Sequence, residues 1–264
     1  KMIFHVYYWM KMYFSIISKQ IMARVFIFFF LIISNSIFGQ KKAFNGFLID
    51  YSYQFPLGQL AETFSNNSAI GINLINKKEN NFFYGLKAAY IFGGNIKDNT
   101  IFDNINTGNG FVIDGNGTFA NIILLQEGFS TNIFGGYAIH LNESNPSGVY
   151  FSAGIGFLQH RIRIDTKNQY IPHLNSDYKK GYDQLTNGIN TNFVVDYIYF
   201  ENKKRLKVYT GIDYSLAFTK NRRAYNLSEM SINENKLRLD QLLGIHFGII
   251  IPINRKNNEE FHYF

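Results

Sequence analysis

Histidine is the side chain that proteins use most often to bind metals or to carry protons near neutral pH. His140, His160 and His246 each fall on the small or polar side of an alternating β-type pattern. A shared metal site would need these side chains within a few ångströms of one ion. Because a strand rises about 3.3 Å per residue, His140 and His160, at opposite ends of neighbouring strands, are expected more than about 20 Å apart. We therefore expect no metal site and no cofactor.

His160, Ser176, Asp177 and Asp183 are of the residue types that form hydrolytic active sites. Serine, histidine and a carboxylate are the nucleophile, base and orienting group of many acyl-transfer enzymes. Nothing in the spacing of these four residues selects them, because serine and aspartate are ordinary loop residues. We therefore expect that the chain is not an enzyme and has no catalytic residues.

A larger set of charged side chains falls on the same side of the strands as the histidines. These residues are Asp50, Lys87, Asp196, Lys207, Asp213, Arg238 and Asp240. Charges of both signs in a narrow interior should pair, since an unpaired buried charge costs several kcal/mol. We expect a network of salt bridges that fills the interior. The alternative is an ion or proton path, which would require space for water.

The strands that would position these side chains are clearest at residues 149–164, VYFSAGIGFLQHRIRI. Val149, Phe151 and Ile155 share one face, while Gly154 and His160 lie on the other. Large apolar residues on one face and glycines on the other are typical of a transmembrane strand, with its apolar face toward lipid and its small residues in a crowded lumen. Since an open sheet edge is too costly in hydrocarbon, such strands occur in closed barrels.

Seven further segments repeat this alternation, which gives eight strands in all. The eight strands are expected at residues 46–55, 68–75, 82–92, 129–141, 149–164, 189–200, 206–219 and 237–252. Connections after the first, third, fifth and seventh strands are long, and those after the second, fourth and sixth are short. Short periplasmic turns and long outer loops are the rule in outer-membrane barrels, so both termini are expected in the periplasm. In the longest connection, Asp114-Gly115-Asn116-Gly117 predicts a projecting hairpin.

Composition agrees with one β-domain. The chain of 264 residues is 17% aromatic and 17% charged, and it has no cysteine, which excludes disulfides and thiolate metal sites. Residues 22–39 have a basic start, an apolar run and a polar end, as a secretory signal peptide does. We interpret residues 1–21 as an over-extended N-terminus. Removing residues 1–39 takes away four of the 26 basic residues and none of the 19 acidic ones, which leaves +3 and does not indicate nucleic-acid binding.

Two arginines continue the outward face of the fifth strand where it leaves the membrane. For Arg161 and Arg163 we consider contact with phosphates of lipopolysaccharide, because a guanidinium fork fits a phosphate well. The equally open alternative is a solvated rim.

Residues 41–264 resemble small outer-membrane β-barrel proteins of Bacteroidota, similar in plan to the OmpA- and OmpX-type barrels. The resemblance rests on the leader ending SIFGQ, the connection PLGQLAETFSNN, the aromatic-rich strands and the aromatic end FHYF. Many such barrels end in a strand whose last residue is phenylalanine. Here the last strand is expected to stop near residue 253, so the tail, residues 254–264, departs from that pattern.

These patterns predict an all-β protein, an eight-stranded antiparallel transmembrane barrel at residues 40–253 in the outer membrane of a Gram-negative bacterium. The expected function is non-enzymatic: a scaffold for surface loops, or a partner of an envelope complex such as secretion or assembly machinery. The expected partners are outer-membrane lipid, lipopolysaccharide and other envelope proteins, and not nucleic acid. Two alternatives stay open, a small channel with a charged lumen and an enzyme acting on lipid or peptide at the rim. A soluble lipocalin-like barrel is disfavoured, because its bulky apolar face would have to point inward.

Overall fold

The computed structural model describes residues 43–98, 100–142, 145–200, 207–233 and 236–253. The expected over-extended N-terminus (1–21), signal peptide (22–39) and C-terminal tail (254–264) lie outside these ranges. Within them, no helix has both the length and the apolar character needed to cross a bilayer.

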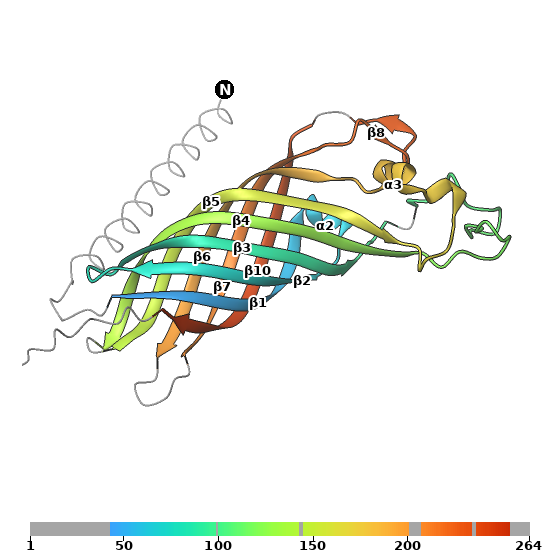
Figure 1. Cartoon of the computed structure of the whole chain (residues 1–264). Coiled ribbons are helices and arrows are strands. Elements are labelled where there is room, and N and C mark those ends of the chain that lie inside the picture. Colours follow the sequence, from blue (N-terminus) through green and yellow to red (C-terminus); the bar gives the residue numbers. More distant parts are fainter. Residues whose placement is uncertain (1–42, 99, 143–144, 201–206, 234–235, 254–264) are drawn as a thin grey trace, which may run out of the picture. The chain divides into compact units, whose positions relative to one another are not determined.

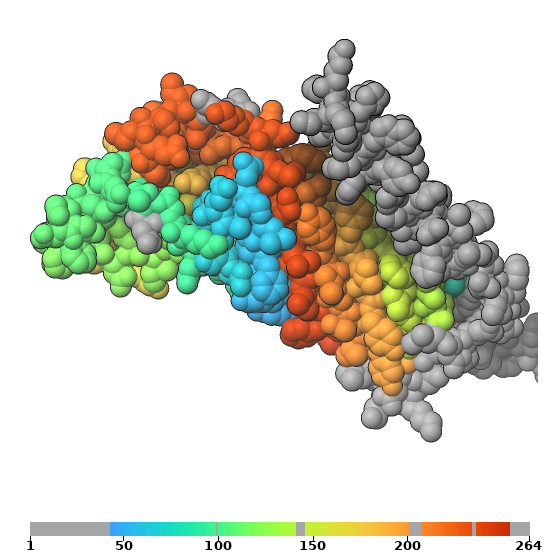
Figure 2. All heavy atoms as spheres, turned by 180° about the vertical axis from the view of Figure 1, so that it is seen from behind, coloured from blue at the N-terminus to red at the C-terminus, as the bar shows by residue number. Residues whose placement is uncertain are grey.

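The described residues form a closed antiparallel barrel of eight strands, as the alternation predicts (Figure 1). The strands are β1 (Phe44–Gly58), β2 (Asn67–Lys77), β3 (Phe82–Asn95), β4 (Ile123–Asn142), β5 (Asn145–Asp165), β6 (Thr186–Phe200), β7 (Lys207–Asn221) and β10 (Arg238–Pro252). Each strand pairs with its neighbours in the chain, and β1 pairs with β10 from Gly46↔Pro252 to Gly58↔Asp240. Figure 2 shows this closing contact, with β1 in blue beside β10 in red.

Shorter elements occupy the long connections. The β1–β2 connection contains α2 (Leu60–Thr63), and the β5–β6 connection contains the 3-10 helix η1 (Pro172–Leu174) and α3 (Ser176–Tyr182). A small separate sheet pairs β8 (Tyr225–Asn226) with β9 (Ser231–Ile232) between β7 and β10. We call the barrel end that carries these connections the long-loop end, and the other the short-turn end.

β4 and β5 run farther than predicted. β4 starts at Ile123, six residues before the expected start, and its ladder with β5 continues to Ile123↔Asp165. The apolar run at residues 122–125 does not alternate, so it gives no strand signal of its own. The neighbouring strand β3 ends in a bulge, where Gly93 and Gly94 both have positive φ. Beyond it, β4 and β5 continue as a two-stranded ribbon.

The hairpin predicted around Asp114 is reduced to a tight turn closed by one bridge, Ile113↔Phe119. Asp114 Oδ1 accepts hydrogen bonds from the backbone N–H groups of Asn116 and Thr118, both at 2.9 Å. The turn does not project freely, because the N–H of Gly115 donates to the carbonyl of Tyr170 at 2.8 Å. The predicted hairpin turn is therefore present, and its end is held against the β5–β6 connection.

Outside and inside of the barrel differ as the alternation predicts. Large apolar side chains cover the outer wall, and Ile133, Ile155 and Phe247 are each at least 60% exposed. The interior has three layers. An apolar layer that includes Leu48, Tyr150 and other buried residues lies toward the short-turn end, a polar layer lies at mid-height, and a larger apolar cluster lies at the long-loop end.

Candidate functional site

The polar layer is centred on His246 of β10. Its Nε2 lies 2.6 Å from Asp196 Oδ1 on β6, and its Nδ1 lies 3.0 Å from Asp213 Oδ1 on β7. A neutral imidazole donates from only one nitrogen, so two carboxylate acceptors require the doubly protonated ring. The arrangement is a buried imidazolium clamped between two carboxylates.

A second part of this layer is built around Asp50 of β1. Its Oδ2 accepts hydrogen bonds from Asn73 Nδ2 and from the Tyr209 hydroxyl, both at 2.7 Å. Lys87 of β3 makes no ion pair within 4.0 Å among the described residues, but it lies within electrostatic range of Asp50, Asp213 and Asp196. We call Asp50, Lys87, Asp196, Asp213 and His246 the lumen cluster.

Each carboxylate of the lumen cluster lies opposite a glycine of a neighbouring strand. The register pairs Asp50 with Gly71, Asp196 with Gly211 and Asp213 with Gly244. An added Cβ at any of these glycines would lie within 2.7 Å of the facing carboxylate. The small residues noted in the sequence therefore provide the space that the acidic side chains occupy.

The other charged residues predicted for the lumen lie elsewhere. At the long-loop end, Asp240 Oδ2 accepts from Thr219 Oγ1 at 2.5 Å and lies 2.9 Å from His160 Nε2, while Arg238 lies 3.3 Å from Asp240 Oδ1. At the short-turn end, Lys207 lies 5.1 Å from the ring of Phe200.

No hydrogen bond or ion pair links the Asp240 group to the lumen cluster in the described part of the chain. The single network expected from the sequence is therefore divided, since residues on one face of the strands lie at different heights along the barrel.

Little space remains between these groups. A cavity of about 30 Å³ borders Lys87, Asn73, Asp196 and His246, enough for about two water molecules. The apolar layers lie on either side of it along the strands. The interior is therefore filled by side chains rather than open from end to end.

The three histidines do not meet. His140 packs against the ring of Tyr150, with centroids 5.8 Å apart, whereas His160 and His246 bind different aspartates. No group of three metal-ligating side chains occurs among the described residues.

The residues considered for hydrolysis, His160, Ser176, Asp177 and Asp183, do not form a catalytic triad among the described residues. His160 is buried against Asp240, Asp183 pairs with Arg223, and Asp177 pairs with Lys180.

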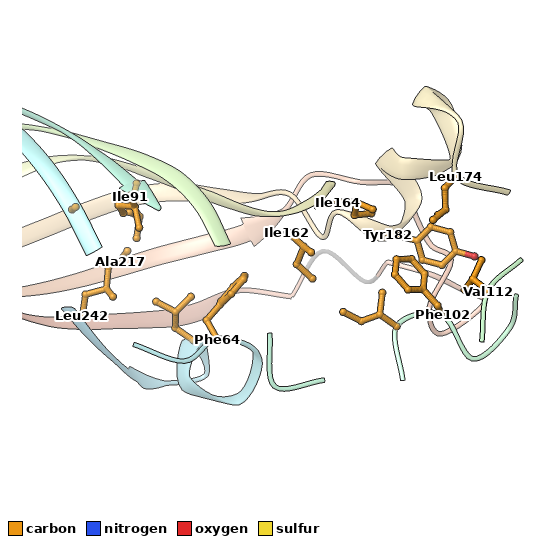
Figure 3. Close-up of a cluster of buried hydrophobic side chains, with 14 of the residues drawn as sticks. Phe64, Ile91, Phe102, Val112, Ile162, Ile164, Leu174, Tyr182, Ala217 and Leu242 are labelled. Atoms are coloured by element: carbon orange, nitrogen blue, oxygen red, sulfur yellow. The ribbon is translucent and has the colours of Figure 1, made fainter. Parts of the chain in front are cut away.

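The long connections pack into a second core that the sequence interpretation missed (Figure 3). It joins the end of the barrel to all four long connections, and its buried members include Phe64, Phe102, Val112, Leu174 and Tyr182. The rings of Phe102 and Tyr182 are 5.3 Å apart, and burial raises the pKa of the Tyr182 hydroxyl. The available signal was the apolar residues in segments 101–105, 111–113 and 171–174, which solvated loops would not need. We call this part the loop domain.

Three large aromatic rings lie on the surface of the loop domain. Phe111 is 52% exposed, Phe119 65% and Tyr170 72%, and the two phenylalanine rings are 4.8 Å apart. The Asp114 turn and its bond to Tyr170 hold their backbones together. We call these three residues the aromatic patch. Exposed rings on an ordered frame are typical of binding surfaces.

Both arginines considered for phosphate binding lie on the outer wall. Arg161 donates from Nε and Nη2 to Glu127 Oε2, at 2.9 and 2.7 Å, and the Tyr90 hydroxyl donates to the other oxygen of Glu127 at 3.0 Å. Arg163 is exposed and makes no hydrogen bond or ion pair among the described residues. The two arginines therefore differ: Arg161 is held by the Glu127 carboxylate, whereas the guanidinium of Arg163 is exposed and has no such partner among the described residues.

No protein-family model and no curated protein matches this chain. Among solved structures it is similar to Neisserial surface protein A (NspA), with 10% sequence identity, 78% of this chain and 96% of that one covered, and a TM-score of 0.42. It is also similar to Ail, the attachment invasion locus protein of Yersinia pestis, with 6% sequence identity and a TM-score of 0.40. The match covers 80% of this chain and 99% of that one. A third similar structure is the outer membrane protein OprG from Pseudomonas aeruginosa, with 14% sequence identity and a TM-score of 0.35. The match covers 81% of this chain and 99% of that one. These likenesses concern the fold alone, which the strand pairing establishes independently.

Proposed function

We propose that this chain is a non-enzymatic integral outer-membrane protein that holds a folded binding surface outside the membrane. The observation that carries the proposal is the contrast between wall and lumen. Phenylalanine, tyrosine and isoleucine cover the wall, while aspartate, lysine and histidine occupy the mid-height layer of the interior, between two apolar layers. In water this arrangement would expose the apolar surface and bury the charges. In lipid the acyl chains cover the apolar wall, while the interior charges are satisfied by their partners inside the barrel.

The difference between the two ends supports an orientation with the short turns and both termini in the periplasm. The β2–β3 connection is a tight turn, in which the N–H of Lys78 donates to the carbonyl of Phe82. The connections at the other end carry the loop domain. Short turns on the periplasmic side are usual for such barrels. The Bacteroidota origin stays a prediction from the sequence resemblance.

The aromatic patch is where we place the binding surface. A rigid barrel with a packed loop domain presents Phe111, Phe119 and Tyr170 without the entropic cost of ordering a mobile loop on binding. The partner is a surface ligand or another envelope protein. Transport through the lumen is the weaker candidate, because the cavity beside Lys87 holds only about two waters.

The deciding experiment is planar-bilayer conductance of the refolded chain from Gln40, with a heat-modifiability gel to establish that the barrel has folded. We expect a folded barrel that does not conduct. Steady channels from the folded protein would refute the scaffold proposal and favour transport. Absence of a heat-modifiable band would instead refute membrane insertion.

A further inference from the structure

The edge of the apolar wall can be located across three strands from their register. On β5, β6 and β7 the outward residues Phe157, Ile189 and Phe218 are aligned in one row. One step closer to the long-loop end, the aligned outward residues are polar: Gln159, Asn187 and Lys220. The wall therefore changes from apolar to polar within two residues of each strand.

Basic side chains continue from this polar row. Arg222, just after β7, donates from Nε to Asn187 Oδ1 at 2.6 Å, and Asn187 Nδ2 donates to Gln159 Oε1 at 3.2 Å. On β5, Arg161 and Arg163 follow Gln159 on the same outward face. We call Arg161, Arg163, Lys220 and Arg222 the basic arc.

The basic arc carries excess positive charge. Glu127 binds Arg161, and Asp165 lies near Arg163, so the four cations are set against two carboxylates. Arg163 and Lys220 make no ion pair with any described residue. Arg161 and Arg222 are each oriented by a hydrogen-bond acceptor but keep further N–H groups available.

The apolar row continues onto the neighbouring strand β10, where the outward residue Leu239 pairs with Phe218 of β7. The basic arc lies on the wall formed by β5 to β7, with Glu127 of β4 at its border.

We infer that the basic arc binds the phosphate groups of a lipid in the outer leaflet. The inference rests on the membrane insertion proposed above and deepens it by naming a lipid class and a side of the barrel. Guanidinium groups match the geometry of phosphate oxygens, and lysine adds a point charge. The site favours a lipid over free phosphate because the arc continues directly into the row of Phe157, Ile189 and Phe218, where acyl chains would lie.

The test compares the refolded protein with a variant carrying Arg163→Gln, Lys220→Gln and Arg222→Gln. Arg161 is left in place so that Glu127 keeps its partner. A control with Lys78→Gln, Lys97→Gln and Lys180→Gln removes the same charge from other parts of the chain. Native mass spectrometry measures retention of diphosphorylated lipid A from detergent micelles, and a heat-modifiability gel checks that each protein is folded.

We expect the arc variant to bind lipid A at least about tenfold more weakly than wild type, and the control to bind like wild type. Binding by wild type should also weaken as salt is raised. Equal retention by a folded arc variant would overturn the inference. Displacement of lipid A by millimolar inorganic phosphate would assign the arc to free anions and overturn it as well. A wild-type chain that gives no folded band would refute membrane insertion itself, which is a separate result.

Discussion

Gly211 faces Asp196 across the β6–β7 ladder, and its replacement by alanine should destabilise the barrel through the lumen cluster. The added Cβ would lie 2.1 Å from Asp196 Oδ1 and 2.4 Å from the carbonyl oxygen of Val195. The carboxylate would have to retreat by about 1 Å to reach even 3.0 Å, a separation that real Cβ atoms rarely go below. That oxygen is the one that binds His246 Nε2 at 2.6 Å, so the hydrogen bond would be lost.

The loss in the free energy of unfolding depends on which partners the buried His246 keeps. Breaking one side of a buried ion pair costs about 3 to 5 kcal/mol, and His246 keeps Asp213 as a second partner. We therefore expect a loss of about 3 kcal/mol in the free energy of unfolding for Gly211→Ala. The measurement is urea unfolding in lipid vesicles, followed by the loss of the heat-modifiable band.

The matched control is Gly135→Ala on β4. Gly135 faces outward, and the nearest atom to its added Cβ is the carbonyl oxygen of Phe83 at 3.8 Å, an ordinary contact. This variant should unfold within about 0.5 kcal/mol of wild type. If Gly211→Ala and Gly135→Ala unfold at the same urea concentration, the steric account of the lumen glycines is refuted. In a background lacking the Asp196 carboxylate, Asp196→Ala, the cost of Gly211→Ala should shrink.

Three further predictions concern separate groups. Lys87→Met should lower the free energy of unfolding in urea by about 1 kcal/mol, because it removes a cation within electrostatic range of Asp50, and adding Asp50→Asn should recover part of the loss; additive losses would contradict the coupling. Arg223→Gln breaks a two-point pair with Asp183 and should make the loop domain sensitive to protease while the barrel band survives; unchanged cleavage would count against the pair as a tether. Backbone hydrogen bonds, first that from Thr118, hold the pKa of Asp114 below its ordinary value. The turn should therefore keep this stabilisation above the unfolded-state pKa of Asp114 and lose it as pH falls through the lowered pKa of the folded state. The chemical shift of the Thr118 amide, followed by NMR, would report this loss.

The long connections share one buried core with the end of the barrel. Phe64, after α2, places its ring 5.5 Å from His160 over the Asp240 group, and Leu239 N–H donates to Gln59 Oε1. The first long connection therefore covers the end of the barrel rather than extending from it. The aromatic patch is fixed to the same body through the Asp114 turn and Tyr170, so its rings are held at defined positions for a partner.

The sequence by itself determined the strands and their two faces. Alternation with a period of two is a local property, so it identified eight strands, the apolar wall, the interior positions of Asp50 and His246, and the short-turn end. The outward placement of Arg161 and Arg163 followed from the same period. A run such as residues 122–125, which does not alternate, was correspondingly missed as the start of β4.

Only the tertiary structure decided which interior side chains meet. Tyr209 and Asp50 are 159 positions apart in the chain and bind across the closed barrel, which depends on register and closure rather than on any local pattern. For the same reason Asp240 and Lys207 fall outside the lumen cluster although they share its face. The packing of Phe102 against Tyr182, and the alignment of Lys220 with Asn187 and Gln159, likewise join segments whose contact is not encoded at short range.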